Sequence, residues 1–171
     1  PAMDGVALLR RTDTKYVLSE ASLLDALACL SHGYRVLDID GTRLQHYRTQ
    51  YFDTENLSLY LRHHAGNGVR FKVRSRAYLD SGVAFFEVKK KNNKEWTTKN
   101  RTRTDDLLLE LSPDAETFLT DHFPSPGQPL RPVLWNEFVR ITLVNKRYPE
   151  RLTLDLDLLF GRGESSVGLP G

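Results

Sequence analysis

The sequence predicts an α+β fold, in which an antiparallel β-barrel carries short helices packed against its outer side. Most of the 171 residues fall in segments where apolar and polar side chains alternate, which is the pattern of a strand with two different faces. Short polar turns join several of these segments, which favours antiparallel neighbours. Three shorter segments repeat their apolar residues with helical spacing and begin at residues that cap helices.

The first third of the chain is predicted to form a strand, a helix and a hairpin. The first strand runs from Lys15 to Leu18. Ser19 can then cap a helix whose leucines have helical spacing, and Gly33 lies just past its end, where a left-handed residue is favoured. Asp40-Gly41 is a hairpin turn signal. The two strands of this hairpin are predicted at Tyr34 to Asp40 and at Leu44 to Phe52.

The rest of the chain is predicted to contain two further helices and five further strands. Thr54 can cap the second helix, which ends at Gly66. Ser112-Pro113 opens the third, because Pro fits the first helical turn, and Pro124 to Gly127 ends it. The strands are predicted at Val69 to Tyr78, Val83 to Lys91, Lys94 to Arg103, Val133 to Val144 and Arg151 to Phe160.

One domain is expected over residues 1–160, followed by a flexible tail over residues 161–171 that is rich in Gly and Ser. No stretch approaches the roughly 20 apolar residues of a membrane span. The sequence leaves open whether the chain has a membrane-bound partner. The single cysteine, Cys29, lies in an apolar helical segment and is predicted to be a buried, inert thiol. Since no internal disulfide can form, a cytoplasmic location is expected.

Three neighbouring strands carry rows of cations. Alternate residues of a strand share a face, and here the intervening residues are largely apolar, so helices are expected to cover that side. Between Arg70 and Arg103 the chain holds eleven cations and three acids, Asp80, Glu87 and Glu95. The predicted rows are Arg70, Lys72, Arg74 and Arg76 in the first strand, Lys89 and Lys91 in the second, and Lys99, Arg101 and Arg103 in the third.

These rows indicate a site for a multivalent anion. Like charges directly opposite each other destabilise a sheet, and for a single strand a solvated outer surface is the ordinary explanation. Several such strands in succession favour a wet tunnel filled by an anion. Phosphate chains fit this site, because Arg offers a fork of donors and Lys a point charge. Arg140 and Arg151 extend the lining, and Asp155 is expected to pair with one of the arginines.

Five short motifs resemble those of one protein family. They are RTDTKY at Arg11 to Tyr16, YFDT at Tyr51 to Thr54, KVRSRAY at Lys72 to Tyr78, FEVK at Phe86 to Lys89 and RLTLD at Arg151 to Asp155. Each motif is weak alone, whereas their order and spacing over nearly the whole chain are specific. The chain thus resembles the VTC domain, a polyphosphate polymerase-type domain of the triphosphate tunnel metalloenzyme (CYTH-like) superfamily.

This resemblance implies a tunnel of antiparallel strands that binds ATP, triphosphate or polyphosphate and transfers the γ-phosphate of ATP onto a growing polyphosphate chain. It also implies a divalent metal, manganese or magnesium, with Asp13 and Glu87 as candidate ligands. Lys89, Arg140 and Arg151 are the candidate catalytic residues. The candidate substrate-binding residues are Lys15, Arg70, Lys72, Arg74, Lys89, Lys99, Arg140 and Arg151.

The family's domain continues with a strand that carries Glu-x-Lys, whose glutamate is a principal metal ligand, and the sequence ends at Leu169-Pro170-Gly171, where this strand is expected to begin. The tunnel domain is therefore expected to be incomplete here, and whether this chain is itself an enzyme stays open. The alternatives are a triphosphatase of the same fold and a non-catalytic module that binds polyphosphate or inositol phosphates. Nucleic-acid binding is the least expected, because Phe71, Phe85, Phe86 and Trp96 form no base-stacking row beside the charges.

Overall fold

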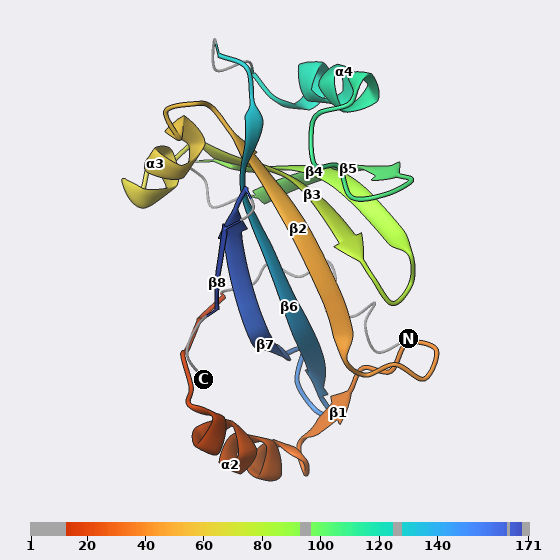
Figure 1. The fold of residues 1–171 in the computed structure, drawn as a ribbon. Helices are drawn as coiled ribbons and strands as arrows, with labels where there is room; N and C mark the ends of the chain where they lie inside the picture. The colour runs from red at the N-terminus through yellow and green to blue at the C-terminus, as the bar shows by residue number, and fades with distance from the viewer. Residues whose placement is uncertain (1–12, 93–96, 125–127, 164, 169–171) are drawn as a thin grey trace.

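The computed structural model describes residues 13–92, 97–124, 128–163 and 165–168, and Figure 1 labels its elements. This part of the chain contains three helices and eight strands, which confirms the predicted α+β class. The helices are α2 (Glu20–Leu30), α3 (Ser58–His64) and α4 (Pro113–His122). The strands are β1 (Tyr34–Val36), β2 (Gln45–Asp53), β3 (Arg70–Tyr78), β4 (Val83–Lys91), β5 (Thr97–Thr104), β6 (Arg131–Asn145), β7 (Arg151–Arg162) and β8 (Ser165–Gly168).

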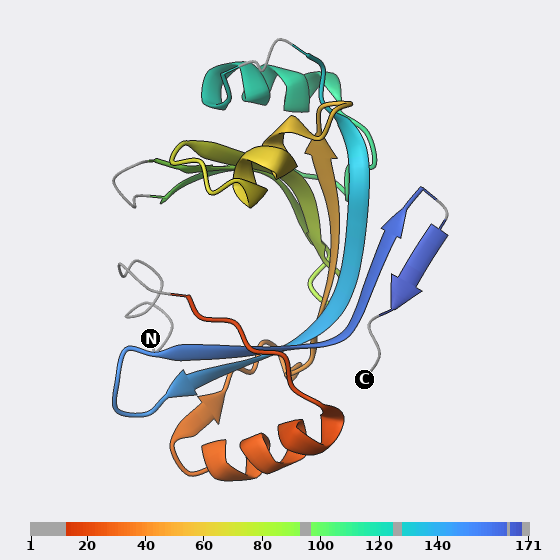
Figure 2. The ribbon, with the colours of Figure 1, turned by 90° about the vertical axis from the view of Figure 1, so that its left-hand side faces the viewer.

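All eight strands belong to one antiparallel sheet. Its order is β5-β4-β3-β2-β6-β7-β8, and β1 also pairs with β6. Figure 2 shows the sheet bent around a concave side, with α3 and α4 over its outer face at one end and α2 at the other. A barrel closes only when the two end strands hydrogen-bond to each other. Among the described residues β5 and β8 form no such pair, so the sheet is open rather than closed into a barrel.

The hydrophobic core lies between the outer face of the sheet and the helices α3 and α4. Val73, Phe86 and Val88 are at most 1% exposed, and Phe71 packs edge-to-face on Phe123 with ring centroids 5.1 Å apart. The core comprises Phe52, Leu59, Phe71, Val73, Phe86, Val88, Ala115, Leu119 and Phe123. The prediction that helices cover the apolar side of β3 and β4 is confirmed. Because side chains alternate, the intervening residues of these strands face the concave side.

The helices α2 and α4 begin where the sequence predicts, whereas α3 begins at Ser58 rather than directly after the predicted cap, Thr54. The Ser19 and Ser112 side chains accept hydrogen bonds from backbone N–H groups in the first turns of α2 and α4. At α3, Thr54 Oγ1 accepts from Ser58 N at 3.0 Å. The buried Asp53 carboxylate accepts from three further backbone N–H groups at 2.7–2.9 Å. The YFDT motif therefore ties the end of β2 to the start of α3.

Two predictions in the first third of the chain are wrong. Lys15 to Leu18 form no strand, and no described strand pairs with them. Asp40 and Gly41 do make a turn, both with positive φ, but a single bridge between Ile39 and Thr42 closes it. Instead of pairing with each other, β1 and β2 both pair with β6, whose 15 residues are long enough to take both.

The predicted flexible tail begins too early. β7 continues to Arg162, and Gly163 then takes a left-handed φ of 58°. The following strand, β8, pairs antiparallel with the end of β7. Backbone pairing, which needs no hydrophobic periodicity, therefore orders a segment whose side chains carry no strand signal.

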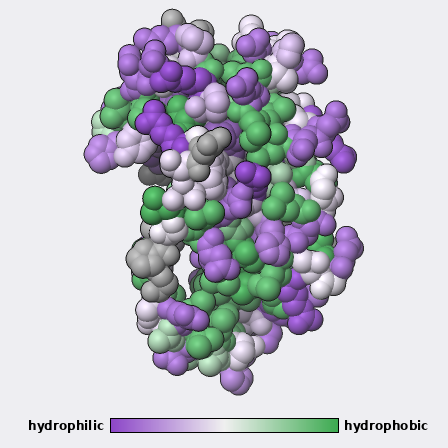
Figure 3. Space-filling model, viewed as in Figure 1, coloured by the Kyte–Doolittle hydropathy of each residue, from purple (hydrophilic) through white to green (hydrophobic). Residues whose placement is uncertain are grey.

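Contrary to the prediction, the helix α2 is not buried. None of its residues is classed as buried, Leu24 is 64% exposed and Cys29 is exposed. Figure 3 shows apolar residues gathering on the lower part of the face seen in Figure 1. Leu23, Leu27 and Leu30, which have helical spacing, are only partly buried within the described part of the chain. Neither α2 nor any other described helix is long and apolar enough to cross a membrane.

Candidate functional site: a cationic concave face

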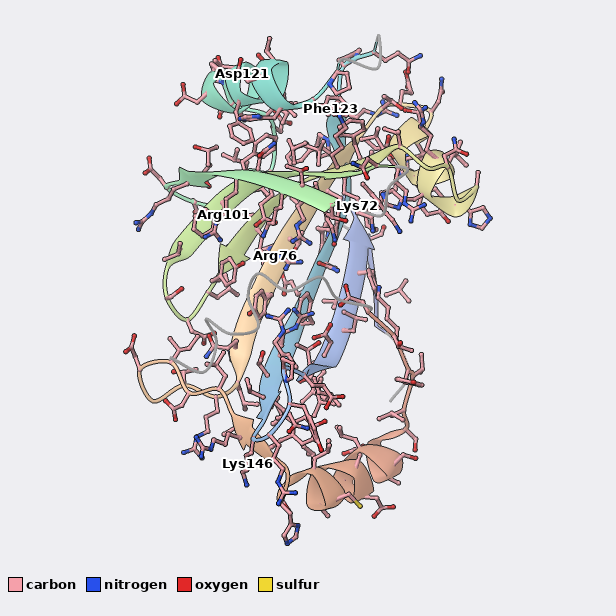
Figure 4. The ribbon with its side chains drawn as sticks, turned by 180° about the vertical axis from the view of Figure 1, so that it is seen from behind. Lys72, Arg76, Arg101, Asp121, Phe123 and Lys146 are labelled. Carbon is pink, nitrogen blue, oxygen red and sulfur yellow. The ribbon has the colours of Figure 1, made fainter. Side chains whose placement is uncertain are left out.

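The concave face of the sheet carries cations in rows that cross the strands (Figure 4). Directly opposite residues in antiparallel strands lie on the same face. Lys72 on β3 lies opposite Lys89 on β4, which lies opposite Lys99 on β5. The adjacent row contains, from β5 to β2, Arg101, Glu87, Arg74 and Tyr51. The alternation in the sequence thus places cations from three strands on one face.

Glu87 is the buried counterion of the second row. Its side chain is 1% exposed. Arg74 Nε donates to Glu87 Oε2 at 2.7 Å, and the Lys99 ammonium pairs with Oε1. Burial raises the pKa of the Glu87 carboxyl, but Arg74 and Lys99 outweigh burial and hold this pKa below its ordinary value. Glu87 is therefore an ionised carboxylate that fixes two cations in place.

The two residues predicted to hold a metal, Asp13 and Glu87, are not grouped as a metal site in the described part of the chain. Both carboxylate oxygens of Glu87 face cations, and a divalent ion there would be repelled by Arg74 and Lys99. Asp13 lies at the exposed start of the described chain. Within the described ranges, no three His, Cys, Asp or Glu side chains are grouped so that they could hold a metal ion. This donor set does not fit manganese or magnesium, which take several oxygen ligands.

Lys72 lies in a strongly positive environment. Burial lowers the pKa of its ammonium group, and repulsion from Lys15, Arg74 and Arg70 lowers it further. Lys15 is therefore within electrostatic reach of Lys72. His63 at the end of α3 responds to the same field: burial, followed by neighbouring cations that include Lys72 and Arg70, lowers its pKa to about 4.

Comparison with known proteins identifies the family. The sequence model of the VTC domain matches residues 10–168. The chain belongs to the VTC domain family. A candidate adenylate cyclase from Bacillus halodurans has a similar structure, with a TM-score of 0.51 and 16% sequence identity over 90% of this chain and 74% of that chain. The VTC domain described here thus has the triphosphate tunnel fold, with an open sheet. No curated protein sequence matches the chain.

Two residues on the concave face of this VTC domain are missing from the sequence-based site. Tyr51 lies opposite Arg74. Burial raises the pKa of the Tyr51 phenol, but the nearby cations, chiefly Arg74 and Arg76, lower it below its ordinary value. Arg76 is 9% exposed, and its Nε donates to Thr49 Oγ1 at 3.1 Å. The alternation that reveals Lys72 also contains Arg76, whereas Tyr51 is visible only from the register of β2 and β3.

Arg140 and Asp155 form a bidentate pair between β6 and β7. Arg140 Nε and Nη2 donate to the two carboxylate oxygens at 2.6 and 2.7 Å. Burial lowers the pKa of Arg140, but the hydrogen bonds to Asp155 outweigh it and raise this pKa above its ordinary value. The prediction that Asp155 pairs with an arginine is confirmed. In this VTC domain, the guanidinium of Arg140 is thus held by a carboxylate.

The predicted site residues fall into two groups. The first lies on β3, β4 and β5, with Lys15 close by, and the second lies on β6 and β7. Since β2 and β3 lie between β6 and β4 in the sheet, the predicted catalytic Arg140 and Arg151 do not lie on strands that pair with that of Lys89. Arg151 lies opposite Val144, at the start of β7. The first group comprises Arg70, Lys72, Arg74, Lys89 and Lys99, and the second comprises Arg140 and Arg151.

Proposed function

We propose that this VTC domain binds the phosphate chain of ATP or polyphosphate along its concave face and transfers the γ-phosphate of ATP onto a polyphosphate chain. The observation that carries the proposal is the row of Lys72, Lys89 and Lys99. These three side chains project from adjacent strands that are roughly 5 Å apart, so their charges repel. The two rows together hold five cations and one carboxylate. A phosphate chain supplies several negative charges in a line and would remove this repulsion.

The residues of the two rows suit different tasks. Lys72 and Lys89 would contact phosphate oxygens as mobile point charges. Arg74 is oriented by Glu87, so its remaining N–H donors would meet a phosphate with little rearrangement. Phosphoryl transfer depends mainly on positioning and charge neutralisation, and it requires no protein nucleophile. No step is assigned to a metal ion, because the described carboxylates do not form a site for one.

A second candidate is a non-catalytic module that binds polyphosphate or inositol phosphates. The observation that favours it is the pairing of both Glu87 oxygens with cations rather than with a metal. A triphosphatase of the same fold would use the same phosphate contacts, with water as the acceptor.

Phosphorus NMR distinguishes these functions. The chain is incubated with ATP in two samples, one with manganese or magnesium and one with EDTA. Growth of an internal polyphosphate signal supports the transferase. Orthophosphate without polymer supports the triphosphatase instead. Unchanged ATP together with calorimetric binding of tripolyphosphate supports the binding module. The absence of both turnover and binding contradicts the whole proposal. The variant Lys72→Gln tests whether the concave face holds the phosphates. Its matched control is Lys90→Gln, because Lys90 is an exposed cation on the opposite side of the sheet, over Phe71.

A further inference from the structure

Four aromatic side chains from four adjacent strands form a belt across the concave face. We call Phe85, Tyr78, Tyr47 and Phe138 the aromatic belt. Along it, the ring centroids of successive pairs lie 6.1, 5.0 and 5.0 Å apart. Tyr47 lies directly opposite both Tyr78 and Phe138, so the strand register places these three residues on one face. Phe85 lies opposite Arg76 and shares the face of the cations.

The belt lies beside the cationic rows and apart from the hydrophobic core. The Arg76 guanidinium carbon is 5.5 Å from the Tyr47 ring centroid and 5.8 Å from that of Phe138. On β5, Arg101 lies 4.4 Å from the Phe85 ring centroid. The core belongs to the other face of the sheet. Tyr47, Tyr78 and Phe85 are half-buried rather than enclosed, so part of the belt is open to the concave side.

Along β3, the cations of the concave face come first and the aromatic belt follows at the end of the strand. Lys72, Arg74, Arg76 and Tyr78 alternate along one face of this strand. At about 3.3 Å per residue, Lys72 and Tyr78 are separated by roughly 20 Å, and Arg76 and Tyr78 by roughly 7 Å. A molecule with an anionic chain at one end and a flat ring at the other matches this order. A bare phosphate chain would use the cations and leave the belt unused.

We propose that the aromatic belt is a subsite for the base of a nucleoside triphosphate. The base lies against Tyr78 and Tyr47, and the phosphates run past Arg76 towards Lys72. This assignment rests on the proposed phosphate binding and adds the nucleoside to it. Contact between a base and aromatic rings depends little on which base is present, and neighbouring guanidinium groups strengthen it. The subsite therefore favours nucleotides over inorganic triphosphate without selecting one base strongly.

Calorimetric titration in metal-free buffer tests this subsite. The chain is titrated with ATP and, separately, with inorganic tripolyphosphate. Tyr78→Leu removes a ring of the belt. We expect it to weaken ATP binding about tenfold and to leave tripolyphosphate binding unchanged. Tyr78→Phe keeps the ring and should retain the affinity for ATP. Tyr148→Leu, at a 68% exposed tyrosine in the β6–β7 turn, is the matched control and should change neither affinity.

The outcomes separate this proposal from the phosphate site itself. Tripolyphosphate binding combined with an ATP affinity that does not respond to Tyr78→Leu overturns the base subsite alone. Equal losses for both ligands overturn it as well, because a structural role for the ring would produce them. Binding of neither ligand by the unmodified chain overturns both proposals. If Tyr78→Leu loses its circular dichroism spectrum, Tyr47→Leu replaces it, with the same selective loss of ATP affinity expected.

Discussion

Arg74 on β3 and Glu87 on β4 lie directly opposite each other, and Arg74 Nε donates to Glu87 Oε2 at 2.7 Å. The carboxylate is almost completely buried, whereas the arginine side chain is 21% exposed. The same carboxylate pairs with Lys99, so a single acid holds cations from two neighbouring strands. This arrangement makes Glu87 part of the scaffold of the concave face.

Glu87→Gln should destabilise the protein. The substitution leaves Arg74 and Lys99 without their carboxylate, and removing one partner of a buried ion pair costs about 3 kcal/mol of unfolding free energy. Urea denaturation measures this change. The control is Glu137→Gln, which breaks the exposed pair with Arg48 and should cost less than about 1 kcal/mol. Equal small losses for the two variants would contradict the scaffold role.

The contribution of Glu87 should disappear in acid. Its pKa in the folded state is depressed below the ordinary value of 4.5, so the stabilisation is fully present above that value and is lost as the pH falls through the lower, folded-state pKa. The difference in unfolding free energy between the unmodified protein and Glu87→Gln should therefore be constant near neutral pH. It should shrink progressively below about pH 4.5. Urea titrations from pH 7 to pH 3 test this, and a difference that does not change with pH would exclude Glu87 as the cause.

Lys72→Gln should stabilise the empty protein. It removes one of two like charges that lie directly opposite each other, Lys72 and Lys89, and such a pairing destabilises a sheet. Thermal unfolding without ligand should show a higher midpoint for Lys72→Gln and no comparable gain for Lys90→Gln. With saturating tripolyphosphate the order should reverse, because bound ligand stabilises the unmodified protein more. A lower midpoint for ligand-free Lys72→Gln would show that the repulsion is already compensated within the protein.

Asp155→Asn should release Arg140. The bidentate pair is partly exposed, so its loss should lower the unfolding free energy by about 1 kcal/mol. If Arg140 takes part in phosphate binding, the freed guanidinium should bind tripolyphosphate more tightly, which calorimetry measures. Reduced affinity together with reduced stability would instead mean that the pair only maintains the β6–β7 side of the sheet.

The parts of the fold that depend on local patterns were predictable. The alternation of cations with apolar residues in β3 and β4 identifies both faces, since a strand has a period of two. Ser112-Pro113 marks the start of α4 for an equally local reason, because capping and the fixed φ of Pro act within one turn. These signals were sufficient to place Lys72, Arg74 and Lys89 on a common face.

The parts that depend on register between distant strands were not predictable. The aromatic belt joins Tyr47 to Phe138, and no sequence pattern reveals that β2 lies beside β6. The same pairing explains why β1 and β2 do not form a hairpin with each other. The sequence also leaves the role of Glu87 open, because a carboxylate among cations can hold a metal or neutralise its neighbours. Only its contacts with Arg74 and Lys99 distinguish the two.

Binding of a phosphate chain through Lys72 is tested most directly by isothermal titration calorimetry with tripolyphosphate. The unmodified chain is compared with Lys72→Gln and with Lys90→Gln, at low and at high salt. We expect the unmodified chain and Lys90→Gln to bind equally, and Lys72→Gln to bind at least about tenfold more weakly, since a hydrogen bond to a charged group contributes roughly 1.5–3 kcal/mol. High salt should weaken binding by the unmodified chain and by Lys90→Gln. Equal affinities for all three proteins, or no binding by the unmodified chain, would contradict the assignment of the concave face as the phosphate site.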